Sequence, residues 1–255
     1  IYSLFLRPDV VLILGVSGCV FLPIFKSVTK AKIITNIDGM EWRRDKWRAP
    51  IKKFLKFSEK LAVNNSHLVI TDNEAIFEYV EKEYKKNSIV IAYGGDHALL
   101  QTHIETLPCD DYYLSLCRIE PENNVKMILE SFKQSGFRIK FIGNWNNSDF
   151  GKEMLNHYKD VLNIELIDPI YDLEELFVIR NNCKGYIHGH SAGGTNPSLV
   201  EAMHFSKPIF AFDCSFNRYS TEDSAYYFDS AASLHSHLIS FEHNPSEVPG
   251  QAMKK

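Results

Sequence analysis

The stretch His188-Gly-His-Ser-Ala-Gly-Gly-Thr-Asn-Pro-Ser-Leu-Val-Glu-Ala-Met203 joins the end of an expected strand to an expected helix through a glycine-rich loop. Residues 185–188 predict a buried strand. Asn196 or Thr195 is suited to cap the helix, and Pro197 suits its first position, where a missing N–H needs no partner. A strand followed directly by a helix is the repeating unit of parallel α/β sheets.

The same alternation of strands and helices extends to both sides of this stretch. The expected strands are 10–14, 31–35, 67–71, 88–92, 112–116, 138–142, 163–167, 185–188, 208–212 and 226–228. The expected helices include 42–60, 73–84, 124–135, 152–159, 173–181, 197–205 and one that begins at Ala231. Residues 97–111 contain few periodic apolar residues, which predicts a linker. We therefore expect an α/β protein with two Rossmann-type, doubly wound domains, residues 1–97 and 98–255, that face a cleft.

Composition limits the class of protein. The chain has 255 residues, of which 45% are hydrophobic, so it is long enough for two ordinary domains and is not globally disordered. The net charge of −4, with both signs mixed, argues against general nucleic-acid binding. The 5 cysteines are scattered, without a Cys-x-x-Cys pair, which indicates a reducing compartment rather than a disulfide framework.

The beginning of the chain predicts neither a signal peptide nor a membrane span. No basic leader with a cleavage site precedes the apolar run 10–25, and this run of 16 residues is shorter than the about 20 that a spanning helix needs. We therefore expect a cytoplasmic protein. A buried parallel strand at 10–14 needs neighbours on both sides, so we also expect that earlier strands are missing and that the first domain is incomplete.

The glycine-rich loop and the helix after it predict an anion site. Gly193 and Gly194 allow a ligand to approach the backbone closely, and the N–H groups of Ser198 and Leu199 are expected to point into the cleft at the positive end of the helix dipole. Glu201 is placed to accept hydrogen bonds from a ribose diol. The alternative is a capped core helix after a flexible loop. The chain contains neither a P-loop nor a Gly-x-Gly-x-x-Gly pattern.

His188 and His190 form a His-x-His pattern at a strand end. A zinc site would need further ligands, and no companion cluster is evident in the sequence, so we expect no metal. Polar histidines that face the cleft are the favoured interpretation, and satisfied structural histidines are the alternative.

Several stretches carry a resemblance to a known family. Residues 193–208 resemble the C-terminal signature of the family-4 glycosyltransferases, which have the GT-B fold. The stretches that together resemble its bacterial rhamnosyltransferase-like branch are Asn36-Ile-Asp-Gly-Met-Glu-Trp-Arg-Arg-Asp-Lys-Trp47, Cys117-Arg-Ile-Glu-Pro-Glu-Asn-Asn124, Phe141-Ile-Gly-Asn-Trp145 and His188-Gly-His-Ser-Ala-Gly-Gly-Thr-Asn-Pro197. The similarity covers nearly the whole chain, and it implies a GT-B-like fold and N-terminal truncation.

The resemblance implies a retaining hexosyltransferase. It would move a sugar, rhamnose or similar, from a dTDP- or UDP-activated donor to a hydroxyl of a growing bacterial surface polysaccharide, which is a glycan or lipid-linked glycan acceptor. Arg118 and the amides around Asn196–Leu199 would stabilise the leaving nucleoside diphosphate, so no metal or other cofactor is required. In the implied mechanism a donor phosphate oxygen can take the acceptor proton, so a protein nucleophile is not needed. The first domain would bind the acceptor and the second the nucleotide sugar.

The implied donor site lies in the second domain. Its expected residues are Gly143, Asn144, His188, His190, Gly193, Gly194, Thr195, Asn196, Ser198, Leu199 and Glu201. The expected catalytic residues are Asp38, Arg118 and Glu201, with Arg118 gripping the diphosphate. The chain departs from the family pattern at Gly193, where a first glutamate is usual, and at Asn123, where a lysine is usual.

The implied acceptor site follows the strand 31–35. Its expected residues are Asp38, Glu41, Trp42, Arg43 and Arg44. Aromatic faces cover the C–H faces of sugars, and Asp38 is the candidate to orient the acceptor or to act as a base. The alternative is a solvated, salt-bridged loop.

A basic segment follows. Residues 43–60 contain eight Lys or Arg against two acids, and Phe54 and Phe57 lie among them. A basic amphipathic helix of this kind favours peripheral contact with the inner membrane surface, whereas a solvated charged face is the alternative.

Three other functions stay open. The same scaffold would suit a nucleotide-sugar epimerase, a nucleotide-sugar binding module without turnover, or a periplasmic-type two-domain binder. A transferase releases the nucleotide from its donor, whereas an epimerase alters the sugar, so the products separate these two functions. The absence of a signal peptide speaks against the last.

Overall fold

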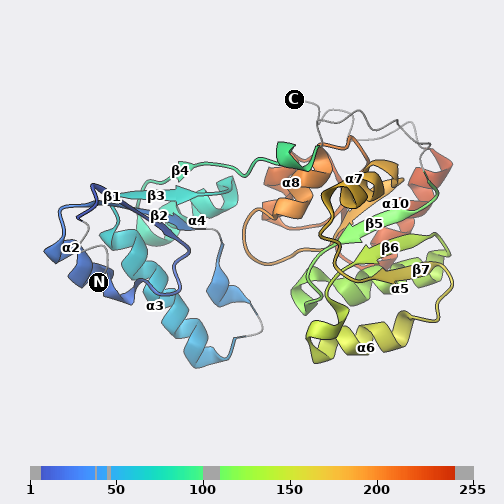
Figure 1. The fold of residues 1–255 in the computed structure, drawn as a ribbon, viewed down its shortest axis with the longest axis horizontal. Coiled ribbons are helices and arrows are strands. Elements are labelled where there is room, and N and C mark those ends of the chain that lie inside the picture. The colour runs from blue at the N-terminus through green and yellow to red at the C-terminus, as the bar shows by residue number, and fades with distance from the viewer. Residues whose placement is uncertain (1–6, 38, 45–46, 100–109, 245–255) are drawn as a thin grey trace. The chain divides into compact units, whose positions relative to one another are not determined.

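The computed structural model of the chain describes residues 7–37, 39–44, 47–99 and 110–244, which divide into two units. Unit 1 consists of the residues up to Tyr93 together with Ala192–Thr195, and unit 2 consists of Gly94–Ser191 and the residues from Asn196 onward. Each unit contains its own parallel sheet (Figure 1).

The described residues of unit 1 form a four-stranded parallel sheet. Its strands, in sheet order, are β1 (Val10–Leu14), β2 (Lys32–Ile37), β3 (Leu68–Thr71) and β4 (Ile89–Val90). The helices between them are α2 (Leu22–Val28), α3 (Ala49–Asn65) and α4 (Glu74–Tyr84), with short 3-10 turns η1 (Cys19–Phe21) and η2 (Glu41–Arg43). Ser58 of α3 joins this layer to the chain after β1, because its hydroxyl accepts from the Cys19 N–H at 2.8 Å and donates to the Val16 carbonyl at 2.6 Å.

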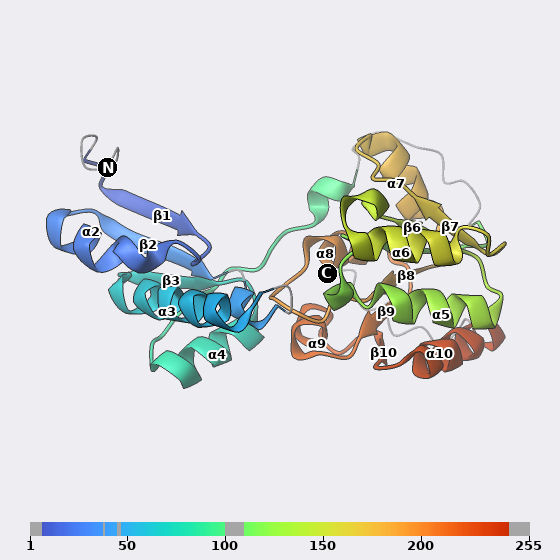
Figure 2. The same ribbon diagram turned by 90° about the horizontal axis from the view of Figure 1, so that it is seen from below.

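The two faces of this sheet differ in exposure. Residues of β2 that point to one face, Ile33 and Ile37, are fully buried. On β1, by contrast, Val10, Leu12 and Leu14 are 52%, 56% and 75% exposed. The expectation of a buried strand at 10–14 is therefore correct in type and wrong in burial, because β1 lies at the edge of the sheet beside β2 (Figure 2).

The described residues of unit 2 form a six-stranded parallel sheet in the order β10-β9-β8-β5-β6-β7. Its strands are β5 (Tyr113–Leu116), β6 (Ile139–Ile142), β7 (Ile164–Ile167), β8 (Gly185–His188), β9 (Ile209–Phe212) and β10 (Tyr226–Phe228). Its helices are α5 (Val125–Ser135), α6 (Asp149–Tyr158), α7 (Leu173–Asn182), α8 (Pro197–Met203), α9 (Ser215–Ser220) and α10 (Ala231–His243), with 3-10 turns η3 (Asp96–Ala98), η4 (Pro121–Asn123) and η5 (Trp145–Asn147).

This strand order is that of a doubly wound Rossmann sheet. The chain runs outward from β5 to β7, returns to β8 beside β5, and then runs outward to β10. The order therefore reverses between β5 and β8. In open sheets of this kind, ligands bind outside the carboxyl ends of the strands at that point.

Helices cover both faces of the unit 2 sheet (Figure 1), and each face packs against them through an apolar layer. One layer contains residues of α5, α6 and α10, and the other contains residues of α7 and α8. Aromatic rings fill the first layer: the Tyr113 ring centroid lies 5.5 Å from that of Phe132 and 5.8 Å from that of Phe210, both in edge-on geometry.

Three helices differ from the expected ones. The expected helix 42–60 is instead η2 followed by α3 from Ala49, because Pro50 suits the first turn of a helix but not its interior. The α6 helix begins at Asp149 because Ser148 caps it by accepting from the Gly151 N–H. The short helix α9 was not expected, since six residues carry too little periodicity to predict one.

Among the described residues, no helix is both long and apolar enough to cross a bilayer.

Candidate functional site

The loops that follow β5, β6, β7 and β8 meet at the reversal point of the unit 2 sheet. They enclose a cavity of about 470 Å³. It is lined by Leu116, Cys117, Arg118, Asn123, Ile142, Gly143, Asn144, Pro169, Ile170, Tyr171, Leu176, Asn196, Pro197, Ser198 and Glu201. The structure thus brings together six residues that the sequence assigned to the site, namely Arg118, Gly143, Asn144, Asn196, Ser198 and Glu201.

Arg118 lies on the loop after β5, which two amide side chains hold in place. The Asn144 Oδ1 atom accepts from the Ile119 N–H at 2.8 Å, and Asn123 Nδ2 donates to the Arg118 carbonyl at 2.7 Å. The Arg118 side chain itself is 56% exposed, and its nearest described carboxylate, that of Glu120, lies 3.6 Å away. A rigid loop therefore presents an accessible guanidinium to the cavity.

Asn123 has a structural part in this arrangement. Asn123 is 3% exposed. Its Nδ2 atom donates to the Arg118 carbonyl, so the Oδ1 atom is the acceptor and takes a hydrogen bond from His190 Nδ1 at 2.8 Å. His190 thus carries its proton on Nδ1 and links the loop after β8 to the loop after β5. Neither His190 nor His188 is among the residues that line the cavity.

Glycines let these loops approach each other. A Cβ atom on Gly143 would lie 2.3 Å from Ile119 Cδ1 and 2.7 Å from the Cys117 carbonyl oxygen. A Cβ atom on Gly189 would lie 2.1 Å from the Asn123 carbonyl oxygen. Any side chain at these positions would therefore push the loops apart.

Glu201 faces the cavity from α8 with two partners that sequence reasoning missed. Its Oε2 atom is ion-paired with Arg180 of α7, and its Oε1 atom lies 3.0 Å from His97 Nε2. Arg180 is buried, and it is separated from Glu201 by a strand and a loop. Arg180 is the only cation of α7, and no local pattern marked it as the partner of Glu201.

The start of α8 differs from the expected anion cradle. Asn196 caps this helix, as expected, but its Oδ1 atom accepts from the Ser198 N–H at 3.0 Å, and its carbonyl accepts from the Leu199 N–H at 3.0 Å. The expectation of free amide groups at Ser198 and Leu199 is therefore wrong, because the cap satisfies both. Leu199 is fully buried in the core.

The rest of the glycine-rich loop belongs to unit 1. The Thr195 N–H donates to Asp72 Oδ2 at 3.0 Å, and the Thr195 hydroxyl donates to the Asp72 carbonyl at 3.1 Å. A Cβ atom on Gly39 would lie 2.9 Å from the Gly193 carbonyl carbon and from the Gly194 nitrogen. The structure therefore groups Gly193, Gly194 and Thr195 with the end of β3 rather than with the cavity.

His188 ends β8 and is 2% exposed. Burial and, secondarily, the neighbouring His190 hold the pKa of His188 well below its usual range, so the ring is neutral at pH 7. Its Nε2 atom has no hydrogen-bond partner among the described residues. Within the same part of the chain, no group of three or more His, Cys, Asp and Glu is arranged to hold a metal ion.

Cys117 lines the cavity as an unreactive thiol. Burial raises its pKa to about 12, and the Arg118 charge only partly opposes this. A thiolate is the nucleophilic form of cysteine, so Cys117 supplies shape rather than chemistry.

The expected acceptor residues lie in unit 1. Asp38 is outside the described residues, and Glu41, Trp42 and Arg43 form η2. Glu41 pairs with Arg44 Nε at 2.9 Å and accepts from Trp47 Nε1 at 2.9 Å. These contacts describe a salt-bridged turn, which is the alternative that the sequence left open for this segment.

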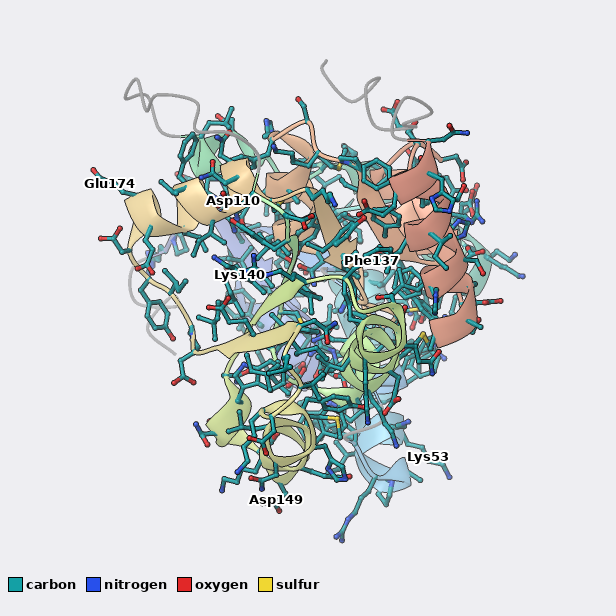
Figure 3. All side chains as sticks on the ribbon, turned by 90° about the vertical axis from the view of Figure 1, so that its right-hand side faces the viewer. Lys53, Asp110, Phe137, Lys140, Asp149 and Glu174 are labelled. Carbon is teal, nitrogen blue, oxygen red and sulfur yellow. The ribbon has the colours of Figure 1, made fainter. Side chains whose placement is uncertain are left out.

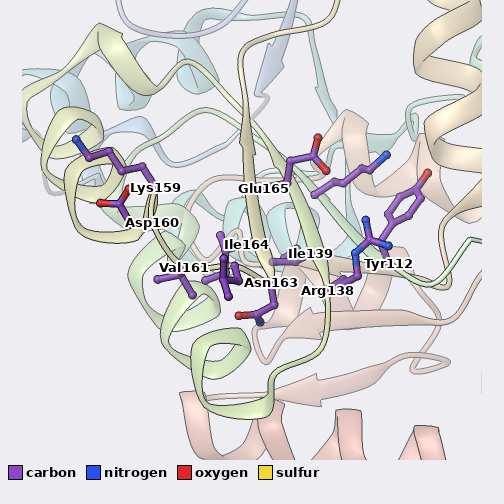
Figure 4. Close-up of a pocket in the computed structure, with 11 residues that line it drawn as sticks. Tyr112, Arg138, Ile139, Lys159, Asp160, Val161, Asn163, Ile164 and Glu165 are labelled. Atoms are coloured by element: carbon purple, nitrogen blue, oxygen red, sulfur yellow. The ribbon is translucent and has the colours of Figure 1, made fainter.

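A second cavity, of about 490 Å³, lies at the opposite ends of the unit 2 strands (Figure 4). Tyr112, Arg138 and Asn163, which directly precede β5, β6 and β7, are among its lining residues. Lys140 Nζ lies 4.3 Å from the Tyr112 ring centroid. Since ligands of such sheets bind at the carboxyl ends, this cavity is the weaker candidate.

Comparison with known proteins shows the fold. Residues 6–96 match a family model described as "Domain of unknown function (DUF1972)". No curated protein matches the chain. The structure resembles that of TarM, with a TM-score of 0.75 at 14% sequence identity. The similarity covers 99% of this chain and 53% of TarM. The structure also resembles sucrose-phosphate synthase from Thermosynechococcus elongatus, with a TM-score of 0.81 at 12% identity over 99% of this chain and 69% of that one.

A third similar structure is HepE from Anabaena in complex with UDP, with a TM-score of 0.77 at 12% identity. The likeness covers 99% of this chain and 74% of HepE. These proteins are glycosyltransferases of the GT-B class with Rossmann-like domains, and the chain has this fold. The chain spans about half the length of TarM.

Proposed function

We propose that the chain is the nucleotide-sugar-binding part of a glycosyltransferase that transfers a hexose from a dTDP- or UDP-activated donor to a glycan hydroxyl. One observation carries this proposal: the cavity at the reversal point of the unit 2 sheet has Arg118 on one loop and Glu201, paired with Arg180, on the facing helix. The similarity of the fold to HepE in complex with UDP supports it.

The cavity offers one feature for each part of a nucleoside diphosphate. Ile142, Pro169, Ile170 and Leu176 give it an apolar wall for a base. The Glu201 carboxylate is an acceptor for ribose hydroxyls. The exposed Arg118 guanidinium can hold diphosphate oxygens through two parallel hydrogen bonds.

The proposed chemistry follows from charge. The leaving nucleoside diphosphate gains negative charge in the transition state, and Arg118 would stabilise it without a divalent metal. In the retaining mechanism that we propose, a donor phosphate oxygen takes the acceptor proton, so no protein nucleophile is needed. Asp38 stays the proposed acceptor-orienting residue, and Glu41, Trp42, Arg43 and Arg44 stay the other proposed acceptor residues.

The finer assignment is also a proposal. The motif resemblance favours the family-4, rhamnosyltransferase-like branch, a rhamnose-type sugar, a bacterial surface polysaccharide as acceptor and a cytoplasmic location. Asn123 is a buried structural amide rather than a lysine, which removes a charge from the diphosphate side. This observation favours, as the second candidate, a module that binds nucleotide sugar without turnover.

The test is calorimetric titration of the chain with UDP and dTDP, in metal-free buffer, with three variants. We expect Glu201→Gln and Arg118→Ala each to weaken binding about 10- to 100-fold, because each loses a charge-assisted hydrogen bond of about 1.5–3 kcal/mol. Arg138→Ala is the matched control, since Arg138 lines the cavity at the other end of the same sheet. Loss of binding in Arg138→Ala alone, or in none of the three, would contradict the proposal. Nucleotide release from a sugar donor then separates the transferase from the binding module.

A further inference from the structure

One side of α3 carries large apolar side chains that face solvent. Leu55, Ala62 and Val63 are buried on the side toward the sheet. On the other side, Phe54 and Phe57 are 49% and 55% exposed. Apolar side chains that gather in this way on a helix mark a contact surface rather than scattered surface residues.

Cations accompany these apolar side chains from Arg48, which precedes the helix, to Lys60. Arg48, Lys53 and Lys60 are exposed, and Lys52 and Lys56 are half-buried. Figure 3 shows Lys53 extending from α3 away from the ribbon. No described carboxylate forms an ion pair with Lys53 or Lys60, so the surface is strongly positive although the whole chain carries a net charge of −4.

The one acidic residue of α3 is withdrawn from this surface. Glu59 is fully buried, and its carboxylate accepts hydrogen bonds from the hydroxyl groups of Tyr79 and Tyr84. Lys56 is held above the same cluster, with its Nζ atom 3.1 Å from Glu83 Oε1 and 4.5 Å from the Trp42 ring centroid. The helix is thereby anchored to α4, and its exposed side carries no acidic residue.

A hollow of about 550 Å³ adjoins the exposed side. Trp42, Phe57 and Tyr84 contribute aromatic walls, and Lys52, Lys53 and Lys60 contribute ammonium groups. Glu83 also lines the hollow, and its carboxylate is paired with Lys56. An anionic headgroup with an apolar tail is the kind of ligand that such a mixture of walls recognises.

We propose that this side of α3, defined by Phe54, Phe57, Lys53 and Lys60, docks the protein on a bilayer that contains anionic phospholipid. Phe54 and Phe57 enter the boundary between headgroups and acyl chains, and the lysines lie at the level of the phosphates. The two exposed phenylalanines favour a bilayer over a polyanion such as an acidic glycan, because apolar side chains partition into acyl chains and gain little from a charged polymer. The proposal is independent of the nucleotide site in unit 2.

The test is flotation of the whole chain with vesicles of phosphatidylcholine, with and without phosphatidylglycerol. We expect binding to the mixed vesicles that weakens as NaCl rises from about 0.05 to about 0.5 M. Lys53→Glu with Lys60→Glu should weaken it by at least about 20-fold, because each cation near the surface contributes about fivefold. Phe54→Ser with Phe57→Ser should weaken it by about tenfold.

Two control variants match these changes on unit 2. Lys126→Glu with Lys152→Glu reverses the same charge at exposed positions of α5 and α6, and Leu162→Ser removes a fully exposed apolar side chain. We expect both controls to bind vesicles as the parent chain does, and all variants to keep the parent circular dichroism and nucleotide affinity. Equal binding to neutral vesicles, no binding to either, or binding that survives loss of both phenylalanines would overturn the proposal. Capture by a heparin or oligonucleotide resin that depends on the lysines alone would assign the surface to a polyanion instead.

Discussion

Arg180 and Glu201 form an ion pair at the wall of the unit 2 cavity, in which the Arg180 side chain is 8% exposed and the Glu201 side chain 17%. The two residues lie on different helices, α7 and α8, with β8 between them in the chain. The carboxylate that we propose for ribose binding is therefore oriented by a buried guanidinium rather than by its own helix.

Breaking this pair is expected to destabilise the chain. Arg180→Met leaves the Glu201 carboxylate in a largely buried position without its main partner, at an expected cost of about 2 kcal/mol. Urea denaturation of Arg180→Met, Glu201→Gln and the double variant measures the coupling between the two residues. We expect a coupling of about 1.5–3 kcal/mol. Strictly additive effects would show that the pair contributes nothing to stability.

Gly143→Ala is expected to destabilise unit 2 and to displace the loop that carries Arg118. The added Cβ atom would lie 2.3 Å from Ile119 Cδ1 and 2.7 Å from the Cys117 carbonyl oxygen, so the loop must move, at an expected cost of about 1–3 kcal/mol. Thermal unfolding and UDP titration check the two effects. Gly18→Ala is the matched control, because Gly18 has a negative φ of −110° and nothing within 4 Å of its Cβ position. A Gly143→Ala chain as stable as Gly18→Ala would contradict the packing argument.

The buried His188 predicts a pH dependence of stability. Because its pKa is lowered in the folded chain, the unfolded chain binds more protons once the pH falls below the ordinary histidine value of 6.5. The stability is thus complete above that pH and is lost as the pH falls toward the lowered pKa, by up to about 1.4 kcal/mol per pH unit.

The check is urea denaturation between about pH 7 and pH 5, which brackets the ordinary histidine pKa. His188→Phe should have a shallower slope than the parent chain, because it removes the group that takes up the proton on unfolding. His243→Asn, at an exposed position of α10, should keep the parent slope. Identical slopes in all three chains would show that His188 is not the group responsible.

Because Glu59 is buried, we expect Tyr84→Phe to lower the free energy of unfolding more than Tyr171→Phe does. Tyr84→Phe removes one of the hydroxyl donors to the buried carboxylate, so we expect a loss of about 1–3 kcal/mol in the free energy of unfolding. Tyr171→Phe should change it little, since Tyr171 is 86% exposed. Denaturation of both variants, followed by tryptophan fluorescence, makes the comparison. A Tyr84→Phe chain with parent stability would mean that water replaces the lost donor.

The local elements of this protein could be read from its sequence. Strand β8 has the expected bounds 185–188, and Asn196 and Pro197 begin α8 as expected. The reason is that apolar runs, caps and prolines act over a few residues, so the pattern itself contains the information. The sequence also predicted that one cavity brings together Arg118, Gly143, Asn144 and Glu201, because the carboxyl ends of parallel strands meet at one edge of a sheet.

The pairs that complete the site depended on the tertiary structure. Asn123 meets His190 across 67 residues, and Thr195 meets Asp72 across 123. Local periodicity contains no information about which distant polar groups become partners, and so Arg180 could not be assigned to Glu201. The exposure of β1 was likewise decided by its place at the edge of the sheet. The sequence alone determined where most strands and helices form and at which ends of the strands the candidate site lies, since these depend on neighbours in the chain. Packing decided which polar groups are satisfied, since that depends on neighbours in space.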